Sequence, residues 1–144
     1  VMDSYSFGYT SSGYMDMPIN HKVFLAQFDT IKALADKESC VIVGRCADYA
    51  LEGYPNMVSV FITGDDDAKI KRLAERNNVT EAKAKEIMMK TDKERSSYYN
   101  YYSSKKWGDV RSYDLCINSS VLGIDGTVNM ILDFANAKMS QKKA

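Results

Sequence analysis

The sequence predicts an α/β protein with three layers, in which a mainly parallel sheet carries helices on both faces. Helical and strand-like segments alternate from residue 19 to the end of the chain. The strand-like runs are short, apolar and β-branched, which is typical of strands buried on both faces. The chain has 144 residues, enough to bury one hydrophobic core, so we expect a single domain over residues 1–144.

The first segments differ sharply in pattern. Residues 1–18 mix Ser, Gly, Tyr and Met without a helical or strand period, and we expect a flexible leader there. Residues 19–37 then repeat large apolar side chains, Phe24 and Phe28 among them, at steps of three and four. This spacing predicts an amphipathic helix, with Asn20 as its N-cap.

Two strands are expected in the next part of the chain. Residues 40–43 are too short and too β-branched for a helix, which predicts a buried strand ending at Gly44. Residues 46–52 are compatible with a short helix. Residues 57–62 form the second strand-like run.

Two helices follow the second run. Residues 68–76 are predicted to be helical, with Asp65 as the cap and a break at Asn77-Asn78. Thr80 is a suitable N-cap for a longer helix that reaches at least Lys93.

The last third of the chain begins without a clear period. Residues 96–109 show no regular apolar spacing, residues 115–117 predict a third strand, and Gly123 precedes a final amphipathic helix. In a parallel sheet, ligands bind beyond the carboxyl ends of the strands. Polar residues that follow the predicted strands are therefore the candidates for a site.

Composition excludes several classes of function. Lys plus Arg and Asp plus Glu each total 19, so no basic surplus indicates a general nucleic-acid binder. No apolar run is long enough to span a bilayer, and we expect no membrane association. The three cysteines are expected to be buried free thiols, which favours the cytoplasm. Their spacing matches no metal signature and His21 is the only histidine, so no metal ligands are predicted.

Arg45 follows the predicted strand directly, after Gly44. Its guanidinium keeps its charge and presents a planar fork of donors that suits bidentate contact with phosphate. Asp48, within one helical turn, could hold this arginine or accept from a sugar hydroxyl. The alternative is a surface pair between Arg45 and Asp48 without a ligand.

A second group of charges lies in KTDKER, residues 90–95. On a helix, Lys90, Lys93 and Glu94 fall near one face, with Arg95 on a neighbouring one. A solvated helix with surface ion pairs is one interpretation. The other is a set of cations that closes over a polyphosphate, because phosphoryl transfer depends on charge neutralisation.

The order of these features resembles that of the cytidylate kinase-like family, a branch of the P-loop nucleoside monophosphate kinases. The resemblance covers roughly residues 20–135 and rests on five segments. They are VIVGR, VSVFITGDDDAKIKRLAERN, KTDKERSSYYNYY, YDLCINSS and LGIDGTVNMILDF. The resemblance implies a P-loop kinase fold, with ATP and Mg²⁺ as cofactors and a monophosphate such as CMP as acceptor.

The resemblance also implies roles for individual residues. Arg45 and Asp48 would bind the acceptor monophosphate, and Glu94 would help to position it. Residues 90–112 would form a lid. Three lid cations would act on the transferring phosphoryl group: Lys90, Lys93 and Arg95. Two polar residues would lie near the donor base: Asn118 and Ser119.

Several positions depart from the family pattern. Cys46 stands where cytidylate kinases have the aspartate of a Gly-Arg-Asp sequence, so the ribose contact of Asp48 is not secured. The lid has lysine at two arginine positions and Ser97 at a third. Nearby cations that could compensate are Lys105, Lys106 and Arg111.

The sequence contains no Gly-x-x-x-x-Gly-Lys-Ser/Thr string, the loop that cradles the donor phosphates. Gly8 and Gly13 have the right spacing, but Tyr14 stands where lysine is needed. In the family this loop and its strand open the chain, so we expect the donor site largely upstream of Val1, and the first strand and P-loop to be absent here. The same expectation leaves an unpaired sheet edge, which is compatible with a homo-oligomer.

Three functions therefore remain open. The leading hypothesis is a nucleotide kinase that transfers the γ-phosphoryl group of ATP to a nucleoside monophosphate. The second is a module that binds a nucleotide or a phosphate through the acceptor pocket without catalysis. The third is an interaction domain whose tyrosine-rich segment contacts another protein and binds no nucleotide.

Overall fold

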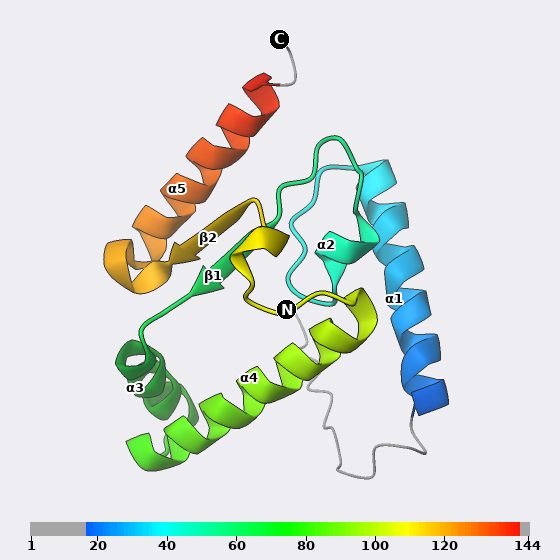
Figure 1. Cartoon of the computed structure of the whole chain (residues 1–144). Helices are drawn as coiled ribbons and strands as arrows, with labels where there is room; N and C mark the ends of the chain where they lie inside the picture. The colour runs from blue at the N-terminus through cyan, green and yellow to red at the C-terminus, as the bar shows by residue number, and fades with distance from the viewer. Residues whose placement is uncertain (1–16, 142–144) are drawn as a thin grey trace. The chain divides into compact units, whose positions relative to one another are not determined.

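The computed structural model of the chain describes residues 17–141 (Figure 1). The chain divides into two compact units between Leu51 and Glu52. The described residues are mostly helical and contain one two-stranded parallel sheet, so the predicted three-layer sheet is not observed among them. Residues 1–16, with most of the predicted leader, lie outside the described range.

The first unit is built on helix α1, which spans Met17–Lys37. Phe24 and Ile31 lie on its buried face. Their burial confirms the predicted amphipathic helix. Asn20 lies inside the helix and does not cap it, because the helix already begins at Met17.

The short helix α2 spans Ala47–Ala50, as the sequence predicted. It packs on α1, where the rings of Phe28 and Tyr49 lie 6.0 Å apart between centroids. Ala47 and Ala50 are buried. Their small side chains allow α2 to lie close to its neighbours.

Residues 40–43 were predicted to form a buried strand, and this prediction is wrong. The segment is neither strand nor helix, and Val41 and Val43 are 92% and 89% exposed. A strand must share its N–H and C=O groups with a neighbour, and the described residues of the first unit include no other strand. A β-branched run shows a tendency to form a strand but does not supply that neighbour.

The second unit contains the sheet. Strand β1 spans Val60–Thr63 and strand β2 spans Leu115–Asn118. They pair in parallel, with Val60 opposite Leu115. Both strands fall within or beside the predicted runs, and helix α5 packs on both of them (Figure 1).

A polar cluster closes the start of this sheet. The Asp114 carboxylate accepts hydrogen bonds from the Ser59 N–H at 2.9 Å and from Lys138 Nζ at 2.7 Å. Lys138 Nζ also donates to the Met57 carbonyl at 2.7 Å. Helix α5 is thereby tied to the chain just before each strand.

Helices α3 and α4 follow β1 and pack against each other. Helix α3 spans Asp66–Asn77 and ends where Asn78 adopts a left-handed conformation, with φ 51°. Helix α4 spans Glu81–Ser103. The Thr80 hydroxyl accepts from the Lys83 N–H at 3.2 Å, which confirms the predicted N-cap.

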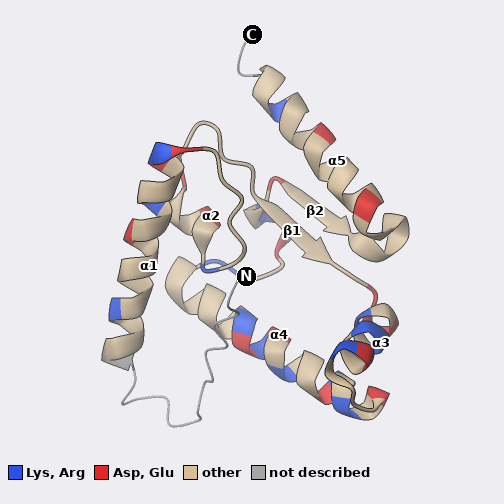
Figure 2. Ribbon diagram, turned by 180° about the vertical axis from the view of Figure 1, so that it is seen from behind, with Lys and Arg blue, Asp and Glu red and all other residues tan. Residues whose placement is uncertain are grey.

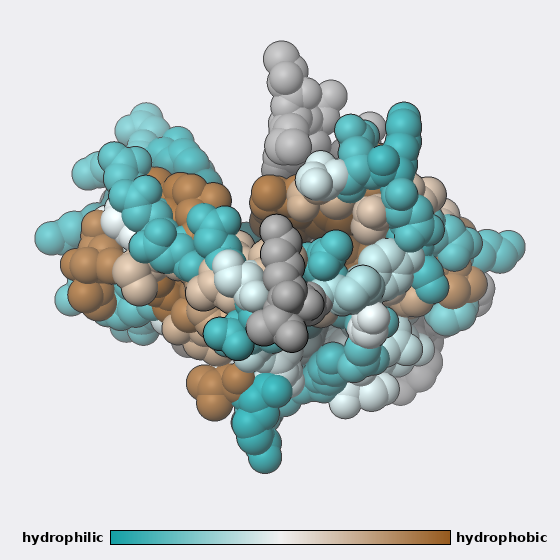
Figure 3. All heavy atoms as spheres, turned by 90° about the horizontal axis from the view of Figure 1, so that it is seen from above, coloured by the Kyte–Doolittle hydropathy of each residue, from teal (hydrophilic) through white to brown (hydrophobic). Residues whose placement is uncertain are grey.

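Helix α5 spans Ser119–Gln141 and is interrupted at Gly123, whose φ of 71° is not helical. The main part of the helix therefore follows Gly123, as predicted, and a short helical turn precedes it. Large apolar side chains on α5 are exposed: Val121, Leu122, Ile124, Val128, Met130 and Leu132. Figure 3 shows hydrophobic residues that reach the surface among hydrophilic ones.

Aromatic side chains fill the space between β1 and the segment after α4. Phe61 contacts Trp107 edge-on at 5.2 Å and Tyr113 at 5.0 Å between ring centroids. Tyr99 is buried and stacks on Tyr113 at 6.1 Å. These rings therefore form core contacts.

The cysteines differ from the expectation that all are buried. Cys46 is buried, but Cys40 and Cys116 are exposed, and none of the three forms a disulfide. Cys40 is the first residue of the unpaired run at residues 40–43, which explains its exposure.

Charged residues gather on α3 and α4, whereas the two strands are almost free of them (Figure 2). Basic and acidic residues are mixed along α3 and along α4 as far as Arg95. Among the described helices, none is long and apolar enough to cross a membrane.

Candidate functional site

The turn before α2 holds three consecutive residues in the left-handed region. The φ angles of Gly44, Arg45 and Cys46 are 73°, 57° and 54°. Glycine adopts this conformation freely, but each of the other two is strained by about 1–2 kcal/mol. The turn closes through a hydrogen bond from the Ala47 N–H to the Gly44 carbonyl at 3.1 Å. Strain of this kind gathers at functional sites.

Arg45 and Asp48 belong to this turn and to α2, and both are half-buried. Cys46 lies between them and is 3% exposed. Burial, and to a smaller degree the charge of Asp48, raises the pKa of the Cys46 thiol to about 12. The thiol therefore stays protonated at neutral pH and is not a nucleophile.

The predicted lid residues lie in the second unit, on the middle of α4. Lys90, Lys93 and Arg95 are exposed, and Glu94 is half-buried. Among the described residues, no carboxylate pairs with Lys90 or Lys93. These two ammonium groups present unneutralised charge to solvent, a feature that attracts anions.

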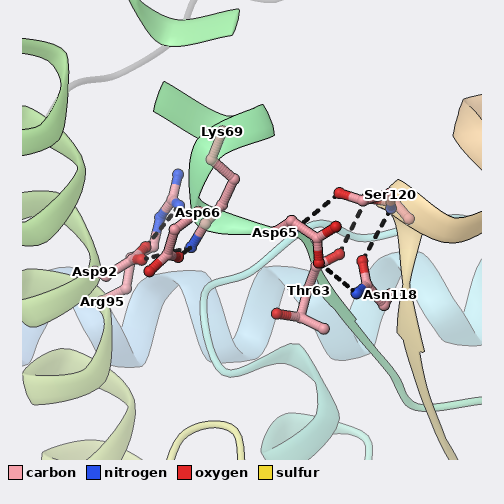
Figure 4. A network of polar contacts seen from close by, with 9 residues as sticks. Thr63, Asp65, Asp66, Lys69, Asp92, Arg95, Asn118 and Ser120 are labelled. Carbon is pink, nitrogen blue, oxygen red and sulfur yellow. Dashed lines mark hydrogen bonds and ion pairs between the residues drawn. The ribbon is translucent and has the colours of Figure 1, made fainter. Parts of the chain in front are cut away.

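Arg95 is part of a chain of ion pairs between α3 and α4 (Figure 4). Arg95 Nη1 lies 3.6 Å from Asp92 Oδ1, and Lys69 Nζ lies 3.4 Å from Asp92 Oδ2. Lys69 Nζ also pairs with Asp66 Oδ1 at 3.2 Å. Asp92 thus offers one oxygen to each cation.

A second network joins the carboxyl ends of β1 and β2 (Figure 4). Asn118 Nδ2 donates to Asp65 Oδ1 at 2.9 Å, and Asn118 Oδ1 accepts from the Ser120 N–H at 2.9 Å. Ser120 Oγ accepts from the Asp65 N–H at 2.9 Å, and Ser119 Oγ donates to the Thr63 carbonyl at 3.0 Å. Both predicted donor-base residues thus use their side chains to fix the loop itself.

The same network changes the role expected for Asp65. Asp65 stands at the N-cap position of α3, but its side chain makes no capping hydrogen bond. Its carboxylate instead accepts from Asn118 on the neighbouring strand. The capping prediction is therefore correct in position and wrong in contact.

Two of the cations that could compensate for the altered lid are paired with carboxylates. Arg111 binds Asp109 through Nε at 3.0 Å and Nη2 at 2.7 Å. These hydrogen bonds lower the pKa of Asp109 to about 2. Lys105 Nζ pairs with Glu52 at 3.1 Å, and Lys106 is exposed.

The structure places the predicted site residues in three groups: the Arg45 turn, the cations of α4 and the end of β2. The last two groups lie in one unit. Two further residues of the charged cluster, Lys69 and Asp92, were not predicted. The i,i+3 spacing of Asp92 and Arg95 signals one link, but nothing in the sequence signals the pair from Lys69 to Asp92, 23 residues apart.

Comparison with known proteins identifies the family of the chain. The model of the cytidylate kinase-like family matches residues 1–121. A cytidylate kinase from Halobacterium salinarum is 24% identical over 107 residues, which are 74% of this chain and 55% of that protein. A cytidylate kinase from Desulfurococcus amylolyticus is 24% identical over 114 residues, 78% of this chain and 60% of that one.

A solved structure is also similar. It is described as an uncharacterized protein from Eubacterium ventriosum ATCC 27560, and it matches with a TM-score of 0.76 and 45% identity. The match covers 80% of this chain and 65% of that one. The chain thus spans a little over half the length of the curated relatives it matches.

Proposed function

The chain belongs to the cytidylate kinase-like family, and on that premise we propose that this protein is a nucleoside monophosphate kinase. It transfers the γ-phosphoryl group of ATP to a monophosphate such as CMP. The observation that carries the proposal is the turn that holds Arg45 in a left-handed conformation. A fold keeps such strain where the position of one side chain matters.

Arg45 is the group that binds the phosphate of the acceptor. A guanidinium offers two parallel N–H donors to two phosphate oxygens, and this fixes the orientation of the phosphate as well as its position. The left-handed turn sets the direction in which the side chain leaves the backbone. The Asp48 carboxylate, within the next turn of the chain, accepts a hydrogen bond from a sugar hydroxyl of the nucleoside monophosphate. Glu94 helps to position the same monophosphate.

Lys90, Lys93 and Arg95 supply positive charge to the transferring group. An oxygen of the acceptor phosphate attacks the γ-phosphorus of ATP. The bond from this phosphorus to the β–γ bridging oxygen breaks, and ADP leaves with the electron pair. Negative charge on the phosphoryl oxygens is neutralised by cations. The exposure of Lys90 and Lys93, and the lack of an acidic partner among the described residues, supports this role.

ATP and Mg²⁺ are the cofactors of the proposed reaction. The described residues contain no group of three or more His, Cys, Asp or Glu side chains that could hold a metal ion. Asp65 has the right chemistry but its Oδ1 already accepts from Asn118. These residues therefore offer no all-protein cage for Mg²⁺, an ion that ordinarily takes one or two carboxylates and completes its shell with water and substrate phosphates.

The side chains of Asn118 and Ser119 fix the conformation of the loop between β2 and α5, which lies near the donor base in this proposal. Their hydrogen bonds to Asp65 and Thr63 fix the path of the backbone from β2 into α5. This loop can then meet the base through its backbone groups.

The test is a kinetic comparison in the full-length protein. We expect Arg45→Ala to raise the acceptor KM by roughly 10- to 100-fold, which is the effect of losing a charge-assisted contact. Arg45→Lys should recover only part of it, because lysine cannot bind bidentately. Arg72→Ala, which removes an exposed arginine on α3, is the matched control.

The assay couples ADP formation to NADH oxidation with ATP and each nucleoside monophosphate in turn. Unchanged kinetics in Arg45→Ala would refute the assignment of the acceptor site. Calorimetric binding of CMP without turnover by the wild type would instead select the non-catalytic binding module. If CMP and related monophosphates neither bind nor react, the proposal of a nucleotide site fails.

A further inference from the structure

Lys69 and Arg95 share the Asp92 carboxylate. Lys69 belongs to α3, and Asp92 and Arg95 belong to α4. Lys69 Nζ lies 3.4 Å from Asp92 Oδ2, while Arg95 Nη1 lies 3.6 Å from the other oxygen. Each cation therefore meets one carboxylate oxygen.

Lys69 belongs to the first turn of α3, shortly after β1. The Lys69 N–H donates to the Asp65 carbonyl at 3.0 Å. A Cβ placed on Gly64 would lie 3.5 Å from Lys69 Cγ and 3.4 Å from Ser120 Oγ, so the lysine stem runs close to the turn between β1 and α3. The Lys69 side chain is only 28% exposed, whereas that of Arg95 is 66% exposed. The pair of Asp92 with Lys69 is thus more shielded from solvent than its pair with Arg95.

We propose that Lys69 is a positioning residue that keeps Arg95 free to act on phosphate. An arginine beside a single carboxylate forms a bidentate pair when both oxygens are available. Lys69 engages one oxygen of Asp92, so Arg95 keeps a single long contact and most of its five N–H donors remain unused. The inference rests on the proposed function only in the purpose it gives to Arg95.

Removal of the lysine then has a specific consequence. In Lys69→Met, both oxygens of Asp92 become available, and Arg95 is drawn into a bidentate pair with it. The Arg95 guanidinium must then break its ion pair with Asp92 before it can contact a phosphoryl group. Asp92→Asn in the same background removes the charge that captures Arg95, and this should release it again.

The test compares kcat for wild type, Lys69→Met, Asp92→Asn and the double variant in the full-length protein. We expect Lys69→Met to lower kcat by about tenfold with little change in acceptor KM, and the double variant to recover most of it. Lys71→Met removes an exposed lysine of the same helix and should change neither parameter. A purely structural role for Lys69 would make the two substitutions additive, and such additivity would overturn the proposal.

A second readout does not depend on catalysis. Arginine side-chain NMR measures rotation about the Nε–Cζ bond of Arg95, which a bidentate carboxylate slows. We expect slow rotation in Lys69→Met and fast rotation in both the wild type and the double variant. Equal rotation rates in all three refute the sharing of Asp92. If rotation behaves as expected but the wild type transfers no phosphoryl group, then the proposed function fails and the sharing stands.

Discussion

The cluster at the start of the sheet gives a sharp prediction for stability. Asp114 accepts from the Ser59 N–H and from Lys138 Nζ, at 2.9 and 2.7 Å. Asp114→Ala removes both contacts at once. We expect this substitution to destabilise the second unit more than any loss of a single surface charge.

The magnitude follows from the two contacts taken separately. Ser59 is 7% exposed, so its amide loses a partner that water replaces poorly. An unsatisfied group of this kind costs about 1–3 kcal/mol. The Lys138 and Asp114 side chains are 27% and 32% exposed, and an ion pair screened to that degree contributes at most about 1 kcal/mol. The Met57 carbonyl still binds the Lys138 ammonium, and the two contributions together amount to about 1–4 kcal/mol.

Urea unfolding followed by the fluorescence of Trp107, the single tryptophan, measures this change in the second unit. Asp114→Asn keeps an acceptor for the Ser59 amide and should cost only about 1 kcal/mol. Asp133→Ala removes an exposed acid from α5 and is the matched control. An unfolding free energy for Asp114→Ala within about 0.5 kcal/mol of the wild type would refute the reasoning.

Three further predictions concern ionisation and backbone shape. The folded pKa of Asp109, about 2, lies below its unfolded value of about 3.9, so the pair with Arg111 stabilises the fold above pH ~4 and this contribution disappears between pH ~4 and ~2. Arg111→Ala should raise the Asp109 pKa in a carboxyl ¹³C NMR titration, and an unchanged midpoint would contradict the pairing. Because the pKa of its thiol is about 12, Cys46 should react with Ellman's reagent at pH 8 only after unfolding, while the other two thiols react in the native protein. Rapid reaction of all three thiols in the native protein would show that Cys46 is accessible. Gly108→Ala should cost about 1–2 kcal/mol in urea unfolding, because φ is +78° and the new Cβ would lie 3.4 Å from Phe61 Cζ; a neutral effect would mean that this turn relaxes.

Much of the helical structure could be predicted from local sequence. Thr80 caps α4, Asn78 ends α3 and Gly123 interrupts α5, because each effect depends on the residue itself and its nearest neighbours. The parallel strands β1 and β2 were predicted from apolar runs for the same reason. The family resemblance, drawn from the order of these segments, is confirmed.

Interactions between distant residues could not be predicted in this way. Residues 40–43 have the composition of a strand, but pairing depends on a neighbour that composition does not specify. The contact from Lys69 to Asp92 joins two helices, and the contact from Asn118 to Asp65 joins two strand ends. Each depends on three-dimensional packing, which a residue pattern encodes only indirectly.

The site was predicted unevenly for the same physical reason. Arg45 was assigned a role because it follows residues 40–43, which were predicted to form a strand and do not. Its positive φ did not appear in the pattern, since such angles are expected mainly at glycine. The cations of α4 were identified by helical spacing. Their division into exposed lysines and a carboxylate-bound Arg95 required the structure.

The short sheet is closed by side chains at both ends. Asp114 and Lys138 pair where the strands begin, and Asp65 and Asn118 are hydrogen-bonded where the strands end. Strands of four residues ordinarily fray from their ends inward. Here the ends are held, so an amide proton between the strands can exchange with solvent only when the whole pair separates. Native-state hydrogen exchange should therefore report β1 and β2 as one cooperative unit with a single free energy of opening.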